Sequence, residues 1–148
     1  MDYGARAQEN FLSGYNCAQA VFLACTEDMG LSTETRAKLA SSFGGGIGGM
    51  RQICGAVSGM LMALGLRYGY CDPADKDAKA AQYEIARALA EEFRQKSGSM
   101  ICRELLGLDE NFKPKPPEAR TEAYYKERPC AALCRQAGEI FERYCESR

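Results

Sequence analysis

The sequence contains no histidine and no tryptophan among its 148 residues. Without histidine, the protein has no His general base, no Ser–His or Cys–His nucleophile pair, no mixed Cys–His zinc site and no His-ligated haem. An excess of charge of one sign is also missing, because 19 basic side chains stand against 20 acidic ones and the formal net charge is -1. We therefore expect no nucleic-acid partner and no binding to an anionic membrane surface.

Long hydrophobic runs are missing too. The longest nearly apolar stretch, residues 53–66, is shorter than the ~20 residues that cross a bilayer, so it predicts a buried helix. The first six residues show no basic segment followed by an apolar one, which a secretory signal would have. We expect a cytoplasmic protein with no membrane span, in a reducing compartment where cysteines rarely form a structural disulfide framework.

Strand signals are scarce, and helix start and stop signals dominate the chain. The content of 46% hydrophobic and 26% charged residues is typical of a packed globular protein, and the length predicts a single domain over residues 1–148. We expect an all-α, single-domain bundle of five to seven helices. The predicted helices cover residues 3–12, 17–29, 33–42, 52–68, 72–96, 100–106 and 129–145.

Three segments carry more detailed expectations. The segment 52–68 is the most hydrophobic, and we place it at the centre of the bundle with these apolar residues in the core: Val57, Met60, Leu61 and Leu64. In the segment 33–42 we expect Arg36 to be exposed and Leu39 to point inward. The polar, proline-containing segment 107–128 is predicted to be an extended crossing segment without a helix.

Cysteine is abundant, with eight residues, and half of them fall at the predicted N-termini of helices: Cys17, Cys54, Cys102 and Cys130. There the helix dipole and the free N–H groups favour a thiolate and lower its pKa. Arg51, Arg103 and Arg128 lie within three residues of these cysteines and act in the same direction. The alternative is that the cysteines are buried as small apolar residues. No close Cys-x-x-Cys pair is present, so any disulfide or metal site has to be assembled by the fold.

A glycine-rich loop precedes the central hydrophobic helix and contains Gly44, Gly45, Gly46, Gly48 and Gly49. It fits the G-x-G-x-x-G pattern, but a helix rather than a strand is predicted before it, which argues against a dinucleotide site. We expect the loop to approach the site of Cys54, where its backbone N–H groups are candidates to bind a thiolate or a cluster sulfide.

Four blocks in order resemble the redox-active C-GCAxxG-C-C family: GYNCAQAV (14–21), FGGGIG (43–48), CGAVSG (54–59) and CREL (102–105). The resemblance covers residues 3–145 and implies redox activity. It implies that the four cysteines of the family correspond to Cys17, Cys54, Cys102 and Cys130. This chain reads Cys-Gly-Ala where the family label reads Gly-Cys-Ala. Cys134, one helical turn after Cys130, is an alternative fourth partner.

Three hypotheses remain open. In the first, the four thiols converge on one site and cycle between thiol and disulfide, as in a thiol oxidoreductase or an electron carrier. In the second, the same four cysteines hold Zn²⁺ or an iron–sulfur cluster. In the third, the chain is a structural or interaction module with buried cysteines. The redox partner stays unidentified, and a homo-oligomer is compatible with the sequence.

Overall fold

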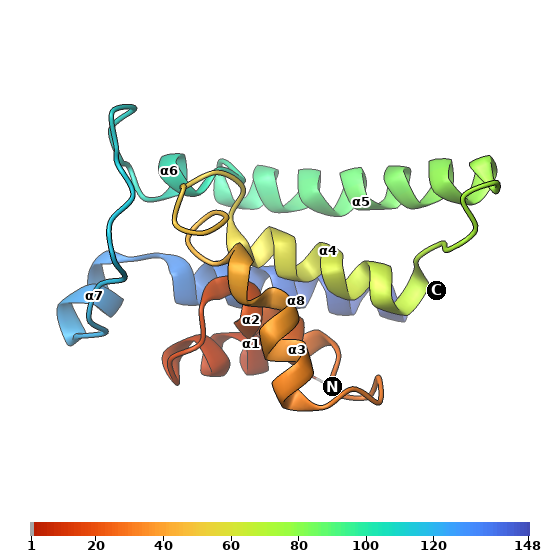
Figure 1. Ribbon diagram of the computed structural model, residues 1–148, viewed down its shortest axis with the longest axis horizontal. Coiled ribbons are helices and arrows are strands. Elements are labelled where there is room, and N and C mark those ends of the chain that lie inside the picture. The colour runs from red at the N-terminus through yellow and green to blue at the C-terminus, as the bar shows by residue number, and fades with distance from the viewer. Residues whose placement is uncertain (1) are drawn as a thin grey trace.

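The computed structural model describes residues 2–148 and is built of α-helices (Figure 1). In chain order they are α1 (Tyr3–Leu12), α2 (Cys17–Cys25), α3 (Thr33–Ala40), α4 (Gly55–Tyr68), α5 (Lys76–Ser97), α6 (Cys102–Leu105), α7 (Glu122–Glu127) and α8 (Cys130–Glu146). A short 3-10 helix, Ser41–Phe43, follows α3. Within residues 2–148, extended pairing is limited to one isolated antiparallel bridge between Ile53 and Ile101. The all-α prediction is confirmed, with one helix more than the expected five to seven.

The additional helix, α7, lies inside the segment that was predicted to be extended. The Thr121 side chain accepts a hydrogen bond from the backbone N–H of Tyr124 at 3.2 Å and so caps this short helix. Before it, the chain crosses the end of α1 and is fixed there by Arg120. The Arg120 guanidinium donates to the carbonyls of Phe11 and Tyr15, both at 2.9 Å, and lies 4.3 Å from the centre of the Phe11 ring.

The end of α2 and the register of α3 differ from the predictions, and one side chain explains both. Arg36 is buried, with 6% of its surface exposed, whereas Leu39 is 52% exposed, so the expected orientation was wrong. The Arg36 guanidinium donates to the Leu23 carbonyl at 2.9 Å and to the Thr26 hydroxyl at 3.1 Å. The last carbonyls of a helix have no partner within the helix, so this buried cation stabilises the end of α2 at Cys25, before the predicted residue 29.

Helix α4 has the central position that its hydrophobicity predicted. It lies between α5 on one side and α1 and α2 on the other in Figure 1, and it contacts α2, α5 and α8. Val57, Met60 and Leu64 are fully buried, while Leu61 is partly buried. No helix within residues 2–148 is both long enough and apolar enough to cross a membrane.

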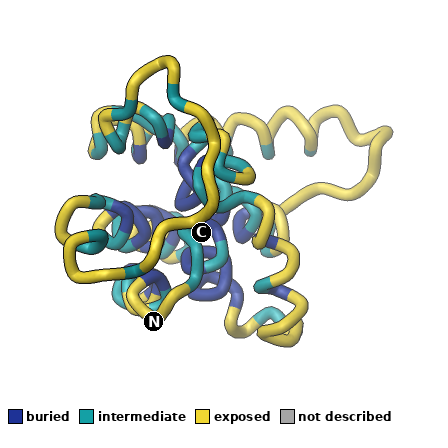
Figure 2. Tube along the Cα trace, turned by 60° about the vertical axis from the view of Figure 1, so that its left-hand side comes forward, coloured by how far each residue is buried: buried dark blue, intermediate teal, exposed yellow. Residues whose placement is uncertain are grey.

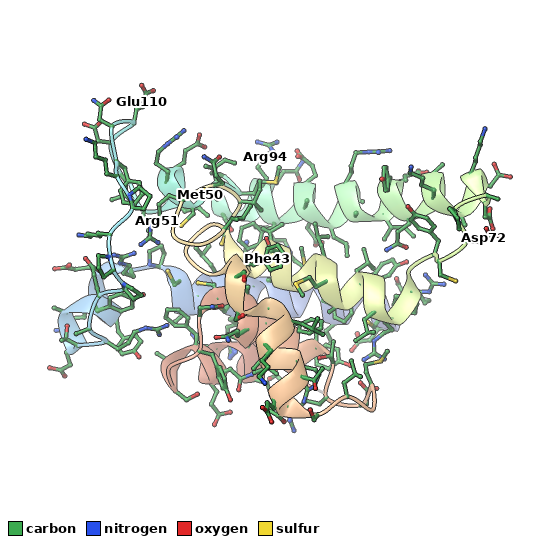
Figure 3. All side chains as sticks on the ribbon, in the orientation of Figure 1. Phe43, Met50, Arg51, Asp72, Arg94 and Glu110 are labelled. Carbon is green, nitrogen blue, oxygen red and sulfur yellow. The ribbon has the colours of Figure 1, made fainter. Side chains whose placement is uncertain are left out.

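Buried residues gather where α1, α2, α4 and α8 meet, whereas the first half of α5 is almost entirely exposed (Figure 2). Only Leu89 and Phe93 of α5 are buried. The glycine-rich loop, with Met50 and Arg51, lies at the end of the molecule that carries α6 and α7, and Asp72 lies at the opposite end (Figure 3).

Close packing of α4 on α2 depends on two glycines. A Cβ atom added at Gly59 would lie 2.5 Å from the Ala18 carbonyl oxygen, and one added at Gly55 would lie 3.0 Å from the Cys17 Cβ. Among residues 2–148, nothing lies within 4 Å of a Cβ added at Gly65, so this third glycine of α4 does not serve helix approach. Because Gly55 and Gly59 have no side chain, the start of α2, with Cys17, lies directly against the start of α4.

Candidate functional site

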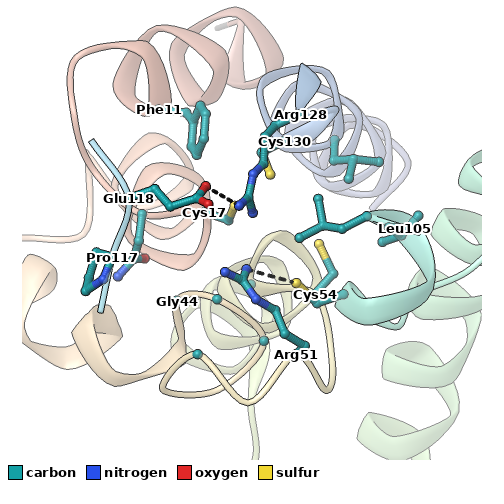
Figure 4. Close-up of a pocket in the computed structure, with 18 of the residues that line it drawn as sticks. Phe11, Cys17, Gly44, Arg51, Cys54, Leu105, Pro117, Glu118, Arg128 and Cys130 are labelled. Atoms are coloured by element: carbon teal, nitrogen blue, oxygen red, sulfur yellow. Dashed lines mark hydrogen bonds and ion pairs between the residues drawn. The ribbon is translucent and has the colours of Figure 1, made fainter. Parts of the chain in front are cut away.

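A cavity of about 310 Å³ opens at the end of the bundle where several helices begin (Figure 4). All four cysteines singled out from the sequence line it: Cys17, Cys54, Cys102 and Cys130. Cys17, Cys102 and Cys130 are the first residues of α2, α6 and α8, and Cys54 is the residue that precedes α4. The prediction that these four lie at helix N-termini is confirmed, although up to 113 residues separate them in the chain.

The other four cysteines do not line this cavity. Cys25 is buried at the end of α2, Cys71 is exposed after α4, and Cys145 is half-buried near the end of α8. Cys134 is buried one turn after Cys130, and its Sγ lies 3.9 Å from the Cys17 carbonyl oxygen. Cys134 therefore lies beside Cys17 on the core side, whereas Cys130 lines the cavity together with Cys17.

Cys17 and Cys130 are the two cavity cysteines whose thiols affect each other's pKa most strongly. The thiol of Cys130 acts to lower the pKa of Cys17, and the thiol of Cys17 raises the pKa of Cys130. The thiol of Cys134 and the burial of Cys17 both raise the pKa of Cys17. Together they outweigh the effect of Cys130, so this pKa lies well above its ordinary value. The pKa of Cys17 thus responds to both neighbouring thiols.

Cys54 and Cys102 form a second pair, held by the Ile53–Ile101 bridge. The Cys54 N–H donates to the Met100 carbonyl at 2.8 Å, and the Cys102 N–H donates to the Gln52 carbonyl at 2.6 Å. In this antiparallel pairing Cys54 and Cys102 are diagonal neighbours, for which the separation is ~7–8 Å. A disulfide needs Cα atoms about 4.4–6.8 Å apart, so the spacing of diagonal neighbours lies just outside the range for direct bonding.

Burial reverses the pKa direction that helix position alone predicted. Desolvation raises the pKa of Cys54 to about 12, although the N–H groups of Ala56 and Val57 at the start of α4 act to lower it. Desolvation also raises the pKa of Cys102 against the opposing effect of Arg51. The prediction of thiolates with lowered pKa values at the helix N-termini was therefore wrong. Desolvation is the largest cause of the rise at Cys54 and Cys102, and the neighbouring Cys17 thiol is the largest cause at Cys130.

These directions predict the order in which a small alkylating reagent modifies the reduced, folded protein. Only the thiolate reacts, and a rise in pKa from 9 to about 12 lowers the thiolate fraction of Cys54 about a thousandfold at neutral pH. We expect exposed Cys71 to be modified first at pH 7, and modification of Cys54 to accelerate about tenfold for each added pH unit. Mass spectrometry of peptides measures this order, with denatured protein as the control. Modification of the cavity cysteines before Cys71 would contradict it.

The glycine-rich loop forms one wall of the cavity with all five predicted glycines. Gly45 to Gly49 all have positive φ values, including 71° at Ile47, and Arg51 has a φ of 60°. An added Cβ at Gly46 would lie 2.7 Å from the Cys102 Cβ, so the loop packs closest to Cys102 rather than to Cys54. The N–H groups of residues 47–49 donate to carbonyls of residues 42–44, which fixes this unusual backbone.

The other wall carries charged side chains that the sequence patterns did not single out: Lys115, Glu118 and Arg120. Arg51 and Arg128 also line the cavity. The Arg51 Nη1 donates to the Cys102 Sγ at 3.6 Å, so this arginine acts on Cys102 and not on the nearer residue in sequence, Cys54. No sequence signal brings the segment 115–120 to the cysteines, because only the crossing of α1 places it there.

Comparison with known families shows to which family the chain belongs. Residues 15–144 match the family described as "Putative redox-active protein (C_GCAxxG_C_C)". The chain belongs to this family. Comparison with curated proteins and with solved structures gave no match. This match confirms the resemblance seen in the sequence. The C-GCAxxG-C-C family as a whole is described as redox-active.

The side chains of this C-GCAxxG-C-C protein are not arranged as a metal or cluster site. Within residues 2–148, no three cysteine, aspartate or glutamate side chains are placed so that they could hold one metal ion. A four-thiolate zinc site needs each sulfur about 2.3 Å from a shared point. The cavity therefore does not present a ready-made site for Zn²⁺ or an iron–sulfur cluster, and the metal hypothesis requires the side chains to rearrange.

Proposed function

We propose that the protein is a cysteine-based redox protein whose cavity thiols cycle between thiol and disulfide, with Cys17 and Cys130 as the bonding pair. The observation that carries the proposal is that Cys17 and Cys130 line one cavity with two further cysteines, although they are far apart in the sequence, and that their thiols shift each other's pKa. Cys54 and Cys102 supply a second pair of thiols in the same cavity.

The reaction is exchange with a disulfide, written XSSX, where X is the group on each sulfur. The Cys17 thiolate attacks one sulfur of XSSX, the S–S bond breaks, and one XS⁻ leaves. The Cys130 thiolate then attacks the Cys17 sulfur of the mixed disulfide and releases the second XS⁻. The protein loses two electrons and forms one S–S bond, XSSX gains two electrons, and the two thiol protons go to the two XS⁻ groups.

The raised pKa values bear on the thiolate that starts the exchange. Burial raises the pKa of Cys54 and Cys102, and the interaction with Cys17 raises that of Cys130. These thiols are therefore protonated near neutral pH, and the exchange starts from a small fraction of thiolate.

Oxidation with diamide, a neutral two-electron oxidant, tests the proposal on the metal-free reduced protein. We expect the loss of one pair of free thiols, counted after denaturation, and its complete recovery with dithiothreitol. Retention of all eight free thiols would refute disulfide cycling and would favour the structural module. Anaerobic purification with metal analysis and a visible spectrum provides the parallel test of the metal hypothesis, and metal held in stoichiometric amount would contradict the proposal.

A further inference from the structure

The cavity is positively charged although the whole chain is not. The chain has a net charge of -1, yet four cationic side chains and a single carboxylate line the cavity: Arg51, Lys115, Arg120, Arg128 and Glu118. This concentration of charge is a property of the folded protein, because the five residues come from two segments that are far apart in the sequence.

The single carboxylate leaves part of this charge uncompensated. Glu118 forms ion pairs with both Arg128 and Lys115. Arg51 has no carboxylate within ion-pair distance among residues 2–148, and its buried Nε has no hydrogen-bond partner in this part of the chain. In Figure 4 the guanidinium groups of Arg51 and Arg128 point into the same space from opposite walls, beside the cavity cysteines.

Two helix N-termini add to this positive potential. Helices α4 and α8 have no side-chain hydrogen bond at their N-terminal cap, so side chains do not neutralise the positive end of either dipole. Cys130 is the first residue of α8, and Cys54 directly precedes α4. The volume of about 310 Å³ is at the lower end of the range for small-molecule sites, so the cavity fits a small ligand better than a segment of a folded partner.

Resting on the proposed function, we propose that the substrate of this site is a small anionic disulfide, whose carboxylates bind between Arg51 and Arg128. This places the S–S bond of the substrate beside Cys17 and Cys130. The exchange is the one written above: two protein thiols become one disulfide, and XSSX becomes two anionic thiols. The positive charge would bind anionic disulfides in preference to neutral or cationic ones. This selection does not depend on the thiols, which are largely protonated.

The test compares the rates at which three small disulfides oxidise the reduced protein: dianionic dithiobis(nitrobenzoate), neutral dithiodipyridine and dicationic cystamine. Exposed Cys71 is replaced by serine in all samples, and each rate is divided by that of the denatured protein with the same reagent. We expect the normalised rate for the dianion to exceed that for the dication by about a hundredfold, with the neutral reagent between them. Equal normalised rates would overturn the inference.

Matched variants locate the effect. Arg51→Gln and Arg128→Gln are each expected to lower the dianion preference about tenfold, whereas Arg51→Lys keeps most of it. Arg87→Gln removes the same charge from the exposed face of α5 and should leave the preference unchanged. Circular dichroism checks that each variant is folded, and a preference that survives both glutamine variants contradicts the proposed site. If diamide forms the disulfide but charge preference is absent, the substrate class is wrong and the proposed function stands; if diamide also fails, both are wrong.

Discussion

Replacing Cys17 with serine is expected to abolish reversible disulfide formation completely. The thiol of Cys17 is the one whose pKa responds to both Cys130 and Cys134, so its removal leaves neither of them a sulfur partner at the start of α2. A hydroxyl is close to a thiol in size, and the replacement should leave the fold intact. The measurement is the count of free thiols after diamide treatment and denaturation, compared before and after dithiothreitol.

Three matched serine variants complete this prediction. Cys71→Ser should oxidise as the unmodified protein does, because Cys71 is exposed and distant from the cavity lining. Cys130→Ser should lose the disulfide, whereas Cys134→Ser should retain it, because Cys130 lines the cavity and Cys134 is closed off in the core. Normal oxidation of the Cys17→Ser protein would show that the bonding pair lies elsewhere.

Replacing Gly59 with alanine is expected to lower the free energy of unfolding by about 1–3 kcal/mol. The new Cβ would lie 2.5 Å from the Ala18 carbonyl oxygen and 3.2 Å from the Phe22 backbone nitrogen, so α2 and α4 have to separate. Urea unfolding followed by circular dichroism measures this change. The same shift moves Cys17 away from α4, and we expect slower diamide oxidation of the folded variant.

The control for this variant lies on the same helix. An added Cβ at Gly65 meets nothing within 4 Å, and Gly65 is inside α4, where alanine is favoured over glycine. Gly65→Ala should therefore raise the free energy of unfolding by about 0.5–1 kcal/mol. Equal effects of the two substitutions would show that close approach of α2 and α4 at Gly59 is not required.

Local signals in the sequence were sufficient for the helices and for the choice of cysteines. Asn16 directly precedes the predicted helix 17–29 and is a residue type that commonly caps helices. In the structure its side chain accepts a hydrogen bond from the Gln19 N–H at 2.9 Å as part of a capping box. The same kind of signal placed Cys17 and Cys130 at helix starts. These features are determined by residues within four positions along the chain, so the sequence alone is sufficient to predict them.

The features that sequence analysis missed depend on contacts between distant segments. Arg36 was expected in solvent because arginine is usually exposed, but the carbonyls at the end of α2 hold it in the core. Arg120 and Glu118 reach the cavity only because the chain crosses α1. The pKa of Cys54 is raised by burial, an effect of the whole fold, and local helix position could not reveal it.

Mapping the disulfide in the oxidised, full-length protein is the most direct test of the central claim. The reduced protein is treated with diamide, remaining thiols are alkylated under denaturing conditions, and the peptides are identified by mass spectrometry without reduction. The account predicts a linked pair of peptides that contain Cys17 and Cys130, with Cys25, Cys71 and Cys145 alkylated. A linkage between any other two cysteines, such as Cys54 and Cys102, or alkylation of all eight cysteines, would contradict it.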